Sequence, residues 1–344
     1  MGFPFRSVVQ FLLTAATIFV IENCTIKDIN SLAIDLGNEM WFTTIQPYLG
    51  YHTVRGNTIK NCGISGLQAM RAINILVEDN LFEQIGWQNA EHAFESGGLK
   101  FHQAVNCLIR RNVFRNIRYA PGIWLDYLST ENCRITKNVF TGITTARGCV
   151  YIEVSRRYCQ VDHNVFHDTH SQYWLSGDYG AGGSALYTDG SDSIRFENNL
   201  MLNIENTGYG SYLNAPRIVD GRGGVTRWHT IEKNIFIDCR KQMIELPNEH
   251  NYTDFNVFSG FSPGYLKMAL PEPALLLDLE AWRKLYGWGK NSRSDIEMAG
   301  SLNTDSLTLT LIIEQGKAKY LEGLGPFTNY TNTVNINLDP RKQK

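Results

Sequence analysis

The strongest constraint on the fold is one asparagine that recurs eight times along the middle of the chain. In seven of the eight copies an apolar residue stands three places before it, and Phe, Ile or Met stands two places after it. Successive copies are 22 to 35 residues apart, so similar units are separated by insertions of different length. The repeated positions are Asn57, Asn80, Asn112, Asn138, Asn164, Asn199, Asn234 and Asn256.

The residues around the asparagine show which of the solenoid folds with repeats of this length the chain can adopt. Leucine-rich repeats need a leucine consensus that this sequence lacks, and helical repeats need apolar residues every three to four positions. The segments alternate instead, as strands with one buried face do. We therefore expect an all-β fold, a right-handed parallel β-helix (solenoid) over residues 18–260, with about 4.8 Å between successive coils. In such a stack, each buried asparagine amide can hydrogen-bond to the next.

Cysteine follows the same register. Cys107, Cys133 and Cys159 each lie five residues before their asparagine, and alternation places that position inside the coil. We interpret them as a column of buried thiols that act as small apolar side chains, in preference to disulfides or a metal site. No CxxC or paired Cys/His spacing indicates zinc.

The two ends of the chain depart from the repeat. Residues 1–17 hold an arginine and then part of an apolar run that is too short to span a bilayer, which is consistent with a signal peptide or an N-terminal cap. The first case implies a secreted or periplasmic protein, and the second a cytoplasmic one. Residues 261–344 mix a helical stretch with strands, and we expect them to form a C-terminal α/β cap over the open end of the stack.

The charge of the chain excludes two classes of partner. Thirty-two Lys and Arg are balanced by 34 Asp and Glu, giving a formal net charge of −2. General nucleic-acid binders and proteins that bind anionic membranes need a basic footprint, so we expect neither partner.

Four strands that precede repeat asparagines can be aligned residue by residue, as "LKFH", "IWLD", "VYIE" and "LYTD". Their first and third residues are apolar or Thr and face the core, so the second and fourth face outward. One outward column is formed by Lys100, Trp124, Tyr151 and Tyr187, and the column beside it by His102, Asp126, Glu153 and Asp189.

Three carboxylates in one column, about 5 Å apart, are costly in a purely structural sheet. Paired carboxylates beside aromatic rings suit glycoside hydrolysis, in which one acid attacks the sugar and the other protonates the leaving oxygen. Glu153 lies between two acids, which favours its protonated form, and it is therefore the predicted acid/base. Asp126 has His102 on its other side and is the predicted nucleophile. Asp189 would support them, and Lys100, Trp124, Tyr151 and Tyr187 would bind the sugar. We expect no metal or cofactor, and an oligosaccharide or polysaccharide as partner.

The stretch from "SGGLKFHQAVNCLIRRNVF" through "GIWLDYLSTENCRITKNVF" to "VYIEVSRRYCQVDHNVF" resembles right-handed β-helix glycoside hydrolases, most closely the β-xylosidases of glycoside hydrolase family 120. The resemblance covers roughly residues 95–170 and implies Asp126 as nucleophile and Glu153 as acid/base. The chain departs from that family at Ser155–Cys159, where the family has His-Gly-Pro, and lacks much of its N-terminal region. Related β-helix glycosidase families share the same strands.

Three other interpretations remain open at this stage. A polysaccharide lyase on the same fold would use a cationic residue such as Lys100 or a base such as His102, with calcium bridging the acids to a uronate. A non-catalytic carbohydrate-binding β-helix would need the aromatic rings but not the acids. The acid column could also be a solvated face that keeps the sheet soluble.

Overall fold

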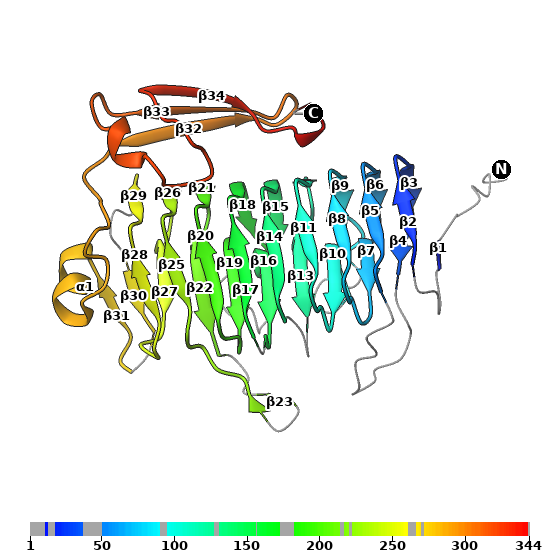
Figure 1. Cartoon of the computed structure of the whole chain (residues 1–344), viewed down its shortest axis with the longest axis horizontal. Helices are drawn as coiled ribbons and strands as arrows, with labels where there is room; N and C mark the ends of the chain where they lie inside the picture. The colour runs from blue at the N-terminus through cyan, green and yellow to red at the C-terminus, as the bar shows by residue number, and fades with distance from the viewer. Residues whose placement is uncertain are drawn as a thin grey trace.

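The computed structural model describes residues 11–12, 18–36, 50–89, 95–126, 131–155, 157–172, 182–213, 217–219, 222–260, 266–269 and 272–342. Their strands form three long sheets stacked around one axis, and successive strands of the chain go to different sheets (Figure 1). All pairings within the three sheets are parallel except the last, between β30 and β31. The predicted right-handed parallel β-helix is confirmed.

We call the three sheets A, B and C. Sheet A consists of β1 (Phe11–Leu12), β4 (Leu32–Asp35), β7 (Ser65–Ala69), β10 (Gly97–His102), β13 (Ile123–Asp126), β16 (Gly148–Glu153), β19 (Ser184–Asp189), β22 (Tyr209–Tyr212), β27 (Ile244–Leu246), β30 (Leu266–Met268) and β31 (Leu275–Leu277). Sheet B consists of β2 (Val20–Glu22), β5 (Thr53–Arg55), β8 (Leu76–Glu78), β11 (Leu108–Arg110), β14 (Cys133–Thr136), β17 (Cys159–Asp162), β20 (Ile194–Glu197), β25 (Thr230–Glu232) and β28 (Tyr252–Asp254). Sheet C consists of β3 (Thr25–Ile29), β6 (Thr58–Cys62), β9 (Leu81–Ile85), β12 (Val113–Arg115), β15 (Val139–Thr145), β18 (Val165–Ser171), β21 (Leu200–Ile204), β26 (Ile235–Cys239) and β29 (Val257–Ser259).

The repeated asparagines form a continuous ladder at the turn from sheet B to sheet C. Asn112 Nδ2 donates to Asn138 Oδ1 at 3.0 Å, and Asn138 Nδ2 donates to Asn164 Oδ1 at 3.0 Å. Each amide oxygen also accepts a backbone N–H, as Asn138 Oδ1 does from Asn112 N at 2.9 Å. The same bonds link all eight residues from Asn57 to Asn256, and all eight are buried. The ladder expected from the sequence is confirmed.

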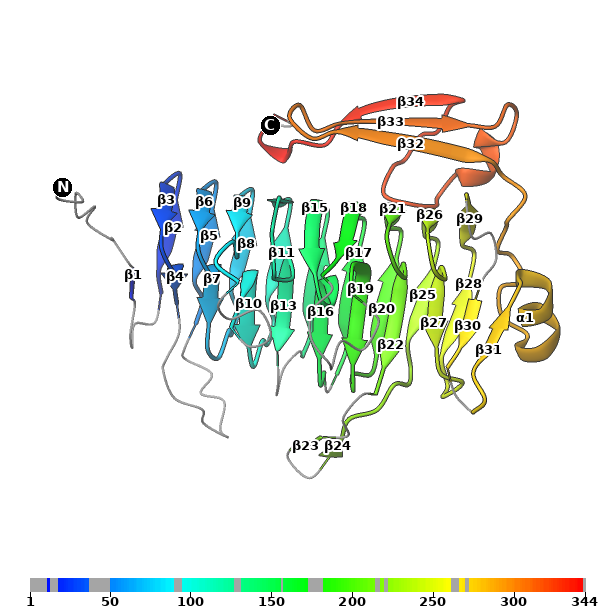
Figure 2. The same cartoon turned by 180° about the vertical axis from the view of Figure 1, so that it is seen from behind.

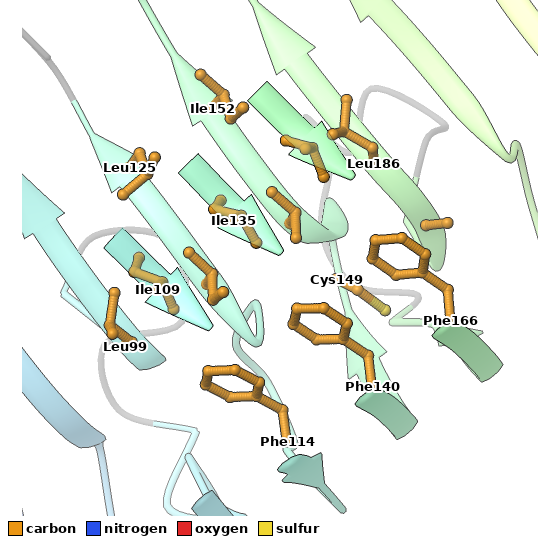
Figure 3. Packing of buried hydrophobic residues seen from close by; sticks show 14 of the residues in the cluster. Leu99, Ile109, Phe114, Leu125, Ile135, Phe140, Cys149, Ile152, Phe166 and Leu186 are labelled. Carbon is orange, nitrogen blue, oxygen red and sulfur yellow. The ribbon is translucent and has the colours of Figure 1, made fainter. Parts of the chain in front are cut away.

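Apolar side chains from all three sheets fill the interior (Figure 3). In four consecutive coils the phenylalanine two places after the asparagine stacks on its neighbour: Phe82, Phe114, Phe140 and Phe166 have centroids 4.8 to 5.0 Å apart and rings within 6° of parallel. Cys133 lies opposite Cys159 in the sheet register, and both are buried in the core. All seven cysteines are free thiols, and the three of the predicted column, Cys107, Cys133 and Cys159, are buried.

The C-terminal segment does two different things. Helix α1 (Leu279–Tyr286) begins at Asp278, whose side chain accepts from Ala281 N at 2.7 Å, and packs Trp282 into the core beside the end of the stack. Strands β32 (Met298–Asn303), β33 (Thr308–Ile313) and β34 (Thr333–Asn337) form an antiparallel sheet that lies along the outer face of sheet C (Figures 1 and 2). They bury the outward Val and Leu of that sheet.

The β-helix extends past the expected boundary at residue 260, because β30 still pairs in parallel with β27. At the other end, β1 pairs with β4, and the rest of residues 1–17 lies outside the described residues. Among the helices that the structure describes, none has the length and apolar character needed to cross a membrane.

Candidate active site

The two outward columns predicted from the sequence lie on sheet A, across β10, β13, β16 and β19. Lys100 pairs in register with Trp124, Trp124 with Tyr151, and Tyr151 with Tyr187. In the second column His102 is opposite Asp126, and Glu153 is opposite Asp189. Asp126 and Glu153 are the last residues of β13 and β16, which pair as neighbours. The structure therefore brings all eight predicted side chains together on one face.

Two basic side chains hold Asp126. Lys100 Nζ lies 2.9 Å from Asp126 Oδ2, and His102 Nδ1 lies 3.4 Å from the same oxygen. The Lys100 side chain is fully buried and its ammonium lies 3.7 Å from the centroid of the Trp124 ring. The buried ammonium of Lys100 therefore fixes the position of the Asp126 carboxylate by a charge-assisted contact.

Glu95, from the segment that leads into β10, completes this cluster. Its Oε2 lies 3.3 Å from Lys100 Nζ and 3.4 Å from His102 Nε2. Partial burial alone would raise the pKa of Glu95, but the hydrogen bond with His102 and the charge of Lys100 hold that pKa below its usual value. Lys100 and His102 thus each lie between two carboxylates, Glu95 and Asp126.

Glu153 has different partners. Trp124 Nε1 donates to Glu153 Oε2 at 3.1 Å, and Arg217 forms an ion pair with Glu153 Oε1. Arg217 comes directly before β23 (Ile218–Val219), which pairs with β24 (Arg222–Gly223) in a small hairpin that projects from the stack (Figure 2). Its positive charge favours the ionised form of Glu153, which opposes the effect of the flanking acids.

The aromatic column forms a closed stack. The Trp124 and Tyr151 rings are 5.0 Å apart, Tyr151 and Tyr187 meet edge to face at 5.1 Å, and Tyr187 stacks on Tyr212 at 4.7 Å. These rings face away from the core, as alternation predicts, and form a cluster separate from it. From the sequence we expected an open platform, yet Trp124 is 5% and Tyr151 4% exposed. Burial, together with the charge of Asp189, raises the pKa of Tyr151 well above its usual value.

Glu95, Arg217 and Tyr212 were not among the residues predicted for the site. Glu95 and Arg217 lie in the long insertions "GWQNAEHAFESGG" and "NTGYGSYLNAPRIVDGRGG", and loops of this kind are common walls of binding pockets. That signal identifies the insertion but not the residue, because an irregular loop has no register from which a side-chain direction can be read. Tyr212 could have been found, since it ends the next strand of the same sheet. In the part of the chain that the structure describes, no group of three His, Cys, Asp or Glu side chains is placed to hold a metal ion.

Comparison with known proteins supports the fold. The family model described as "Right handed beta helix region" matches residues 11–166. The solved structure of XylC in complex with xylose superposes with a TM-score of 0.62 at 16% identity, covering 93% of this chain and 61% of that one. The catalytic unit of an α-1,3-glucanase of family GH87 from Streptomyces thermodiastaticus strain HF3-3 matches with a TM-score of 0.44 at 14% identity, covering 65% of this chain and 46% of that one. A search of curated proteins returned no match.

These comparisons confirm the resemblance to β-helix glycoside hydrolases that the strand motifs suggested, and at this level of identity the likeness concerns the fold. The chain spans 61% of the XylC structure, so the activity of that larger protein is not carried over to it here. Three parallel sheets stacked in sequence order, the asparagine ladder and the matched family model lead to one conclusion. The protein is a right-handed parallel β-helix protein.

Proposed function

We propose that the protein is a glycoside hydrolase in which Asp126 is the nucleophile and Glu153 the acid/base of a retaining reaction. One observation carries the proposal: two carboxylates end adjacent parallel strands, and each has its own set of polar partners. Lys100 and His102 contact Asp126, whereas Trp124 and Arg217 contact Glu153. Two acids in different environments are the arrangement that a reaction with a nucleophile and a proton donor requires.

The strand register supports a retaining mechanism. Leu125 is opposite Ile152, so Asp126 and Glu153, one residue further on, rise from neighbouring strands about 4.8 Å apart. Side chains that leave such positions in parallel carry carboxyl groups about 5–5.5 Å apart, whereas inverting enzymes need about 6.5–9.5 Å to admit a water.

In the first step, Asp126 attacks the anomeric carbon while Glu153 gives its proton to the glycosidic oxygen, so that the C–O bond breaks and the aglycone leaves. In the second step, Glu153 takes a proton from water, and the resulting hydroxide displaces Asp126 from the anomeric carbon. Lys100 Nζ contacts Asp126 Oδ2 and orients that carboxylate for the attack. From the sequence we expected Lys100 to bind the sugar; we now propose that it positions Asp126, because its ammonium is fully buried and contacts both Glu95 and Asp126.

The ion pair with Arg217 sets a condition on Glu153. A carboxyl group that pairs with a guanidinium is ionised and cannot donate a proton. We therefore propose that the substrate separates Arg217 from Glu153 when it binds. The hairpin at Arg217 can allow this, because the Arg217 side chain is 37% exposed.

For the sugar, we propose a β-linked xyloside. The support is the resemblance of the strand motifs to β-xylosidases, together with the likeness in fold to XylC, whose structure holds xylose. A polysaccharide lyase is less well supported, because both Lys100 and His102, the residues that it would use, contact Asp126 and Glu95.

The test is a panel of aryl glycosides, with the product anomer followed by NMR. We expect hydrolysis of at least one aryl β-glycoside, aryl β-xyloside first, and a first product with the anomeric configuration of the substrate. An inverted first product would contradict the two-step mechanism. An unsaturated product from a uronate polymer would show that the enzyme is a lyase, which cleaves by elimination, and would contradict the hydrolase proposal.

A further inference from the structure

A second place in the fold presents side chains that the candidate active site does not use. It is a groove of about 380 Å³ at the corner where strands of sheet C turn toward sheet A. Five residues line it: Asn61, Gln84, Trp87, Asn116 and Arg118. Asn61 and Gln84 belong to the neighbouring strands β6 and β9, and Asn116 directly follows the next strand, β12.

A repeated backbone turn explains why these polar side chains gather. Asn61, Gln84 and Asn116 each have a φ of 55°, in the left-handed region. The turn occurs once per coil, so the three side chains lie along the stack at about the strand spacing of 4.8 Å. A stack that repeats one turn therefore builds a row of hydrogen-bonding groups on its surface.

Gln84 is the unusual member of this row. The left-handed region is tolerated by Gly, Asn and Asp and is costly for longer side chains. Every other described residue at this turn is one of those three types: Asp28, Asn61, Asn116, Gly142, Asp168, Asn203, Asp238 and Gly260. Gln84 is therefore the one long side chain at this turn among the described residues, and it lines the groove together with Trp87.

Four of the five side chains that line the groove have no hydrogen-bond, ion-pair or ring partner among the described residues. The fifth, Asn61, donates from Nδ2 to Asp28 Oδ1 at 2.8 Å, in the same way as Asn203 Nδ2 donates to Asp168 Oδ1 at 2.9 Å further along the row. Among the described residues, the side chains of Gln84, Asn116 and Arg118 have no hydrogen-bond or ion-pair partner. Trp87 is 42% exposed, and no other ring stacks on it within that same part of the chain.

We propose that this groove binds a neutral oligosaccharide chain at a site separate from the acid column. An indole face packs against the apolar face of a sugar ring, and it loses little conformational freedom in doing so. Amides both donate and accept hydrogen bonds, and so do sugar hydroxyls, whereas the single cation, Arg118, adds only donors. A row of amides at strand spacing suits a ligand that is itself a chain of similar units.

The groove also has a defined relation to the acid column. Strand β10 begins at Gly97, on the groove side, and ends at His102, in the acid column. Six residues of strand separate the two places, roughly 20 Å. A polysaccharide bound at Trp87 would therefore be held near the acid column without occupying it. The proposal does not depend on hydrolysis, and its test is a binding measurement.

Co-sedimentation of the full chain with insoluble xylan and with amorphous cellulose tests the site, using both wild type and Asp126→Asn so that turnover does not affect the result. We expect both proteins to bind at least one of these neutral polymers, and Trp87→Ala to lower the association constant roughly fivefold or more. Trp228→Ala is the matched control, because Trp228 is another exposed tryptophan, 47% exposed, beside β25 and under the Arg227 guanidinium. It should bind as wild type does.

Gln84→Gly separates binding from folding. Glycine relieves the left-handed backbone and removes the amide, so we expect an equal or higher melting temperature together with weaker binding. Unchanged binding by Trp87→Ala or by Gln84→Gly would overturn the proposal. The proposal would also be overturned if Trp228→Ala lost as much binding as Trp87→Ala, or if neither neutral polymer sedimented the protein. Binding to the acidic polymer polygalacturonate alone would likewise overturn it.

Discussion

The asparagine ladder and the acid column are both rows of polar side chains at one position of successive coils, but they satisfy their polar atoms in opposite ways. An amide carries a donor and an acceptor, so Asn112, Asn138 and Asn164 bond to one another and need nothing from outside the row. Ionised carboxylates carry only acceptors. Asp126 therefore takes Lys100 from the next column and the imidazole of His102 from the end of its own column. Glu153 takes Trp124 from the next column and Arg217 from a distant loop.

The comparison separates structure from function within a single repeat. A row that satisfies itself stabilises the stack and can continue through every coil. A row that cannot satisfy itself costs free energy unless other elements supply charge, and it is confined here to four coils in the middle of sheet A. We therefore expect variants of the two rows to fail in different assays.

The largest expected effect is on turnover. Asp126→Asn should lower kcat by roughly 10⁴-fold or more on every substrate, because a neutral amide cannot form the glycosyl-enzyme. Measured initial rates with aryl glycosides check this. Glu197→Gln is the matched control: it alters a carboxylate at the end of a sheet B strand, where Arg195 and Gln160 are its partners, and should keep full activity. Turnover within tenfold of wild type would remove Asp126 from the mechanism.

Glu153→Gln should have a smaller effect that depends on the substrate. With a poor leaving group, the loss of the proton donor should cost about 10²–10⁴-fold in kcat, whereas a nitrophenolate needs no proton to leave. Comparing kcat over a series of leaving-group pKa values measures the difference. An equal loss on every substrate would argue against Glu153 as the acid.

Variants of the asparagine ladder should lose stability instead of activity. Asn138→Ala and Asn164→Ala should each lower the free energy of unfolding by about 1–3 kcal/mol, because each leaves buried groups of its neighbours unpaired. Denaturant titration measures this, with Asn335→Ala on exposed β34 as the control, expected within about 0.5 kcal/mol of wild type. If the ladder variants matched the control, the amide row would not stabilise the stack.

A third polar group, His229, extends the comparison to the core. It is fully buried, its Nδ1 lies 2.6 Å from Tyr209 Oη, and its Nε2 lies 3.0 Å from Ser191 O. Burial lowers the pKa of His229 to about 4. The unfolded chain, with an ordinary histidine pKa near 6.5, then binds more protons between these values, so stability falls as the pH drops through this window.

For wild type we expect the free energy of unfolding to fall by on the order of 1–2 kcal/mol between pH 6.5 and 5. Denaturant titration at each pH measures this change. His229→Gln should be less stable at pH 7, and its stability should change less over the same interval. An equal slope in both proteins would assign the acid sensitivity to other groups.

The smallest expected effect is a shift in pH dependence. Arg217→Gln removes the charge that favours ionised Glu153, so Glu153 should stay protonated to higher pH. Because the acid must be protonated, the alkaline limb of the kcat/KM profile should move to higher pH by roughly half a unit to one unit. The pH–rate profile measures this, and Arg157→Gln is a control at an exposed ion pair with Glu131. A limb that does not move would contradict the proposal that Arg217 controls the protonation of Glu153, because kcat/KM reports the free enzyme, in which the two side chains are paired.

Local sequence rules were sufficient wherever the repeat is regular. The asparagine spacing predicted the coils, and alternation predicted that Cys133 faces the core and that Trp124 faces away from it; both are confirmed. The alignment of four strands predicted that Asp126 and Glu153 lie on neighbouring strands. These features follow from the chain because a β-strand has a period of two and a parallel stack keeps its register.

Contacts between segments that are distant in sequence were decided only by the tertiary structure. The sequence does not show that Arg217 returns to Glu153, that Glu95 reaches Lys100, or that the aromatic rings are covered. It also does not show that β32–β34 lie along sheet C. The insertions and the C-terminal segment have no repeat that fixes their direction. Their position depends on which exposed apolar face they can cover and which unpaired charge they can bind. The register of the coils follows from a short sequence pattern that repeats along the chain. The partners of the acids come from segments distant in sequence, and only the folded structure fixes the distance between their atoms.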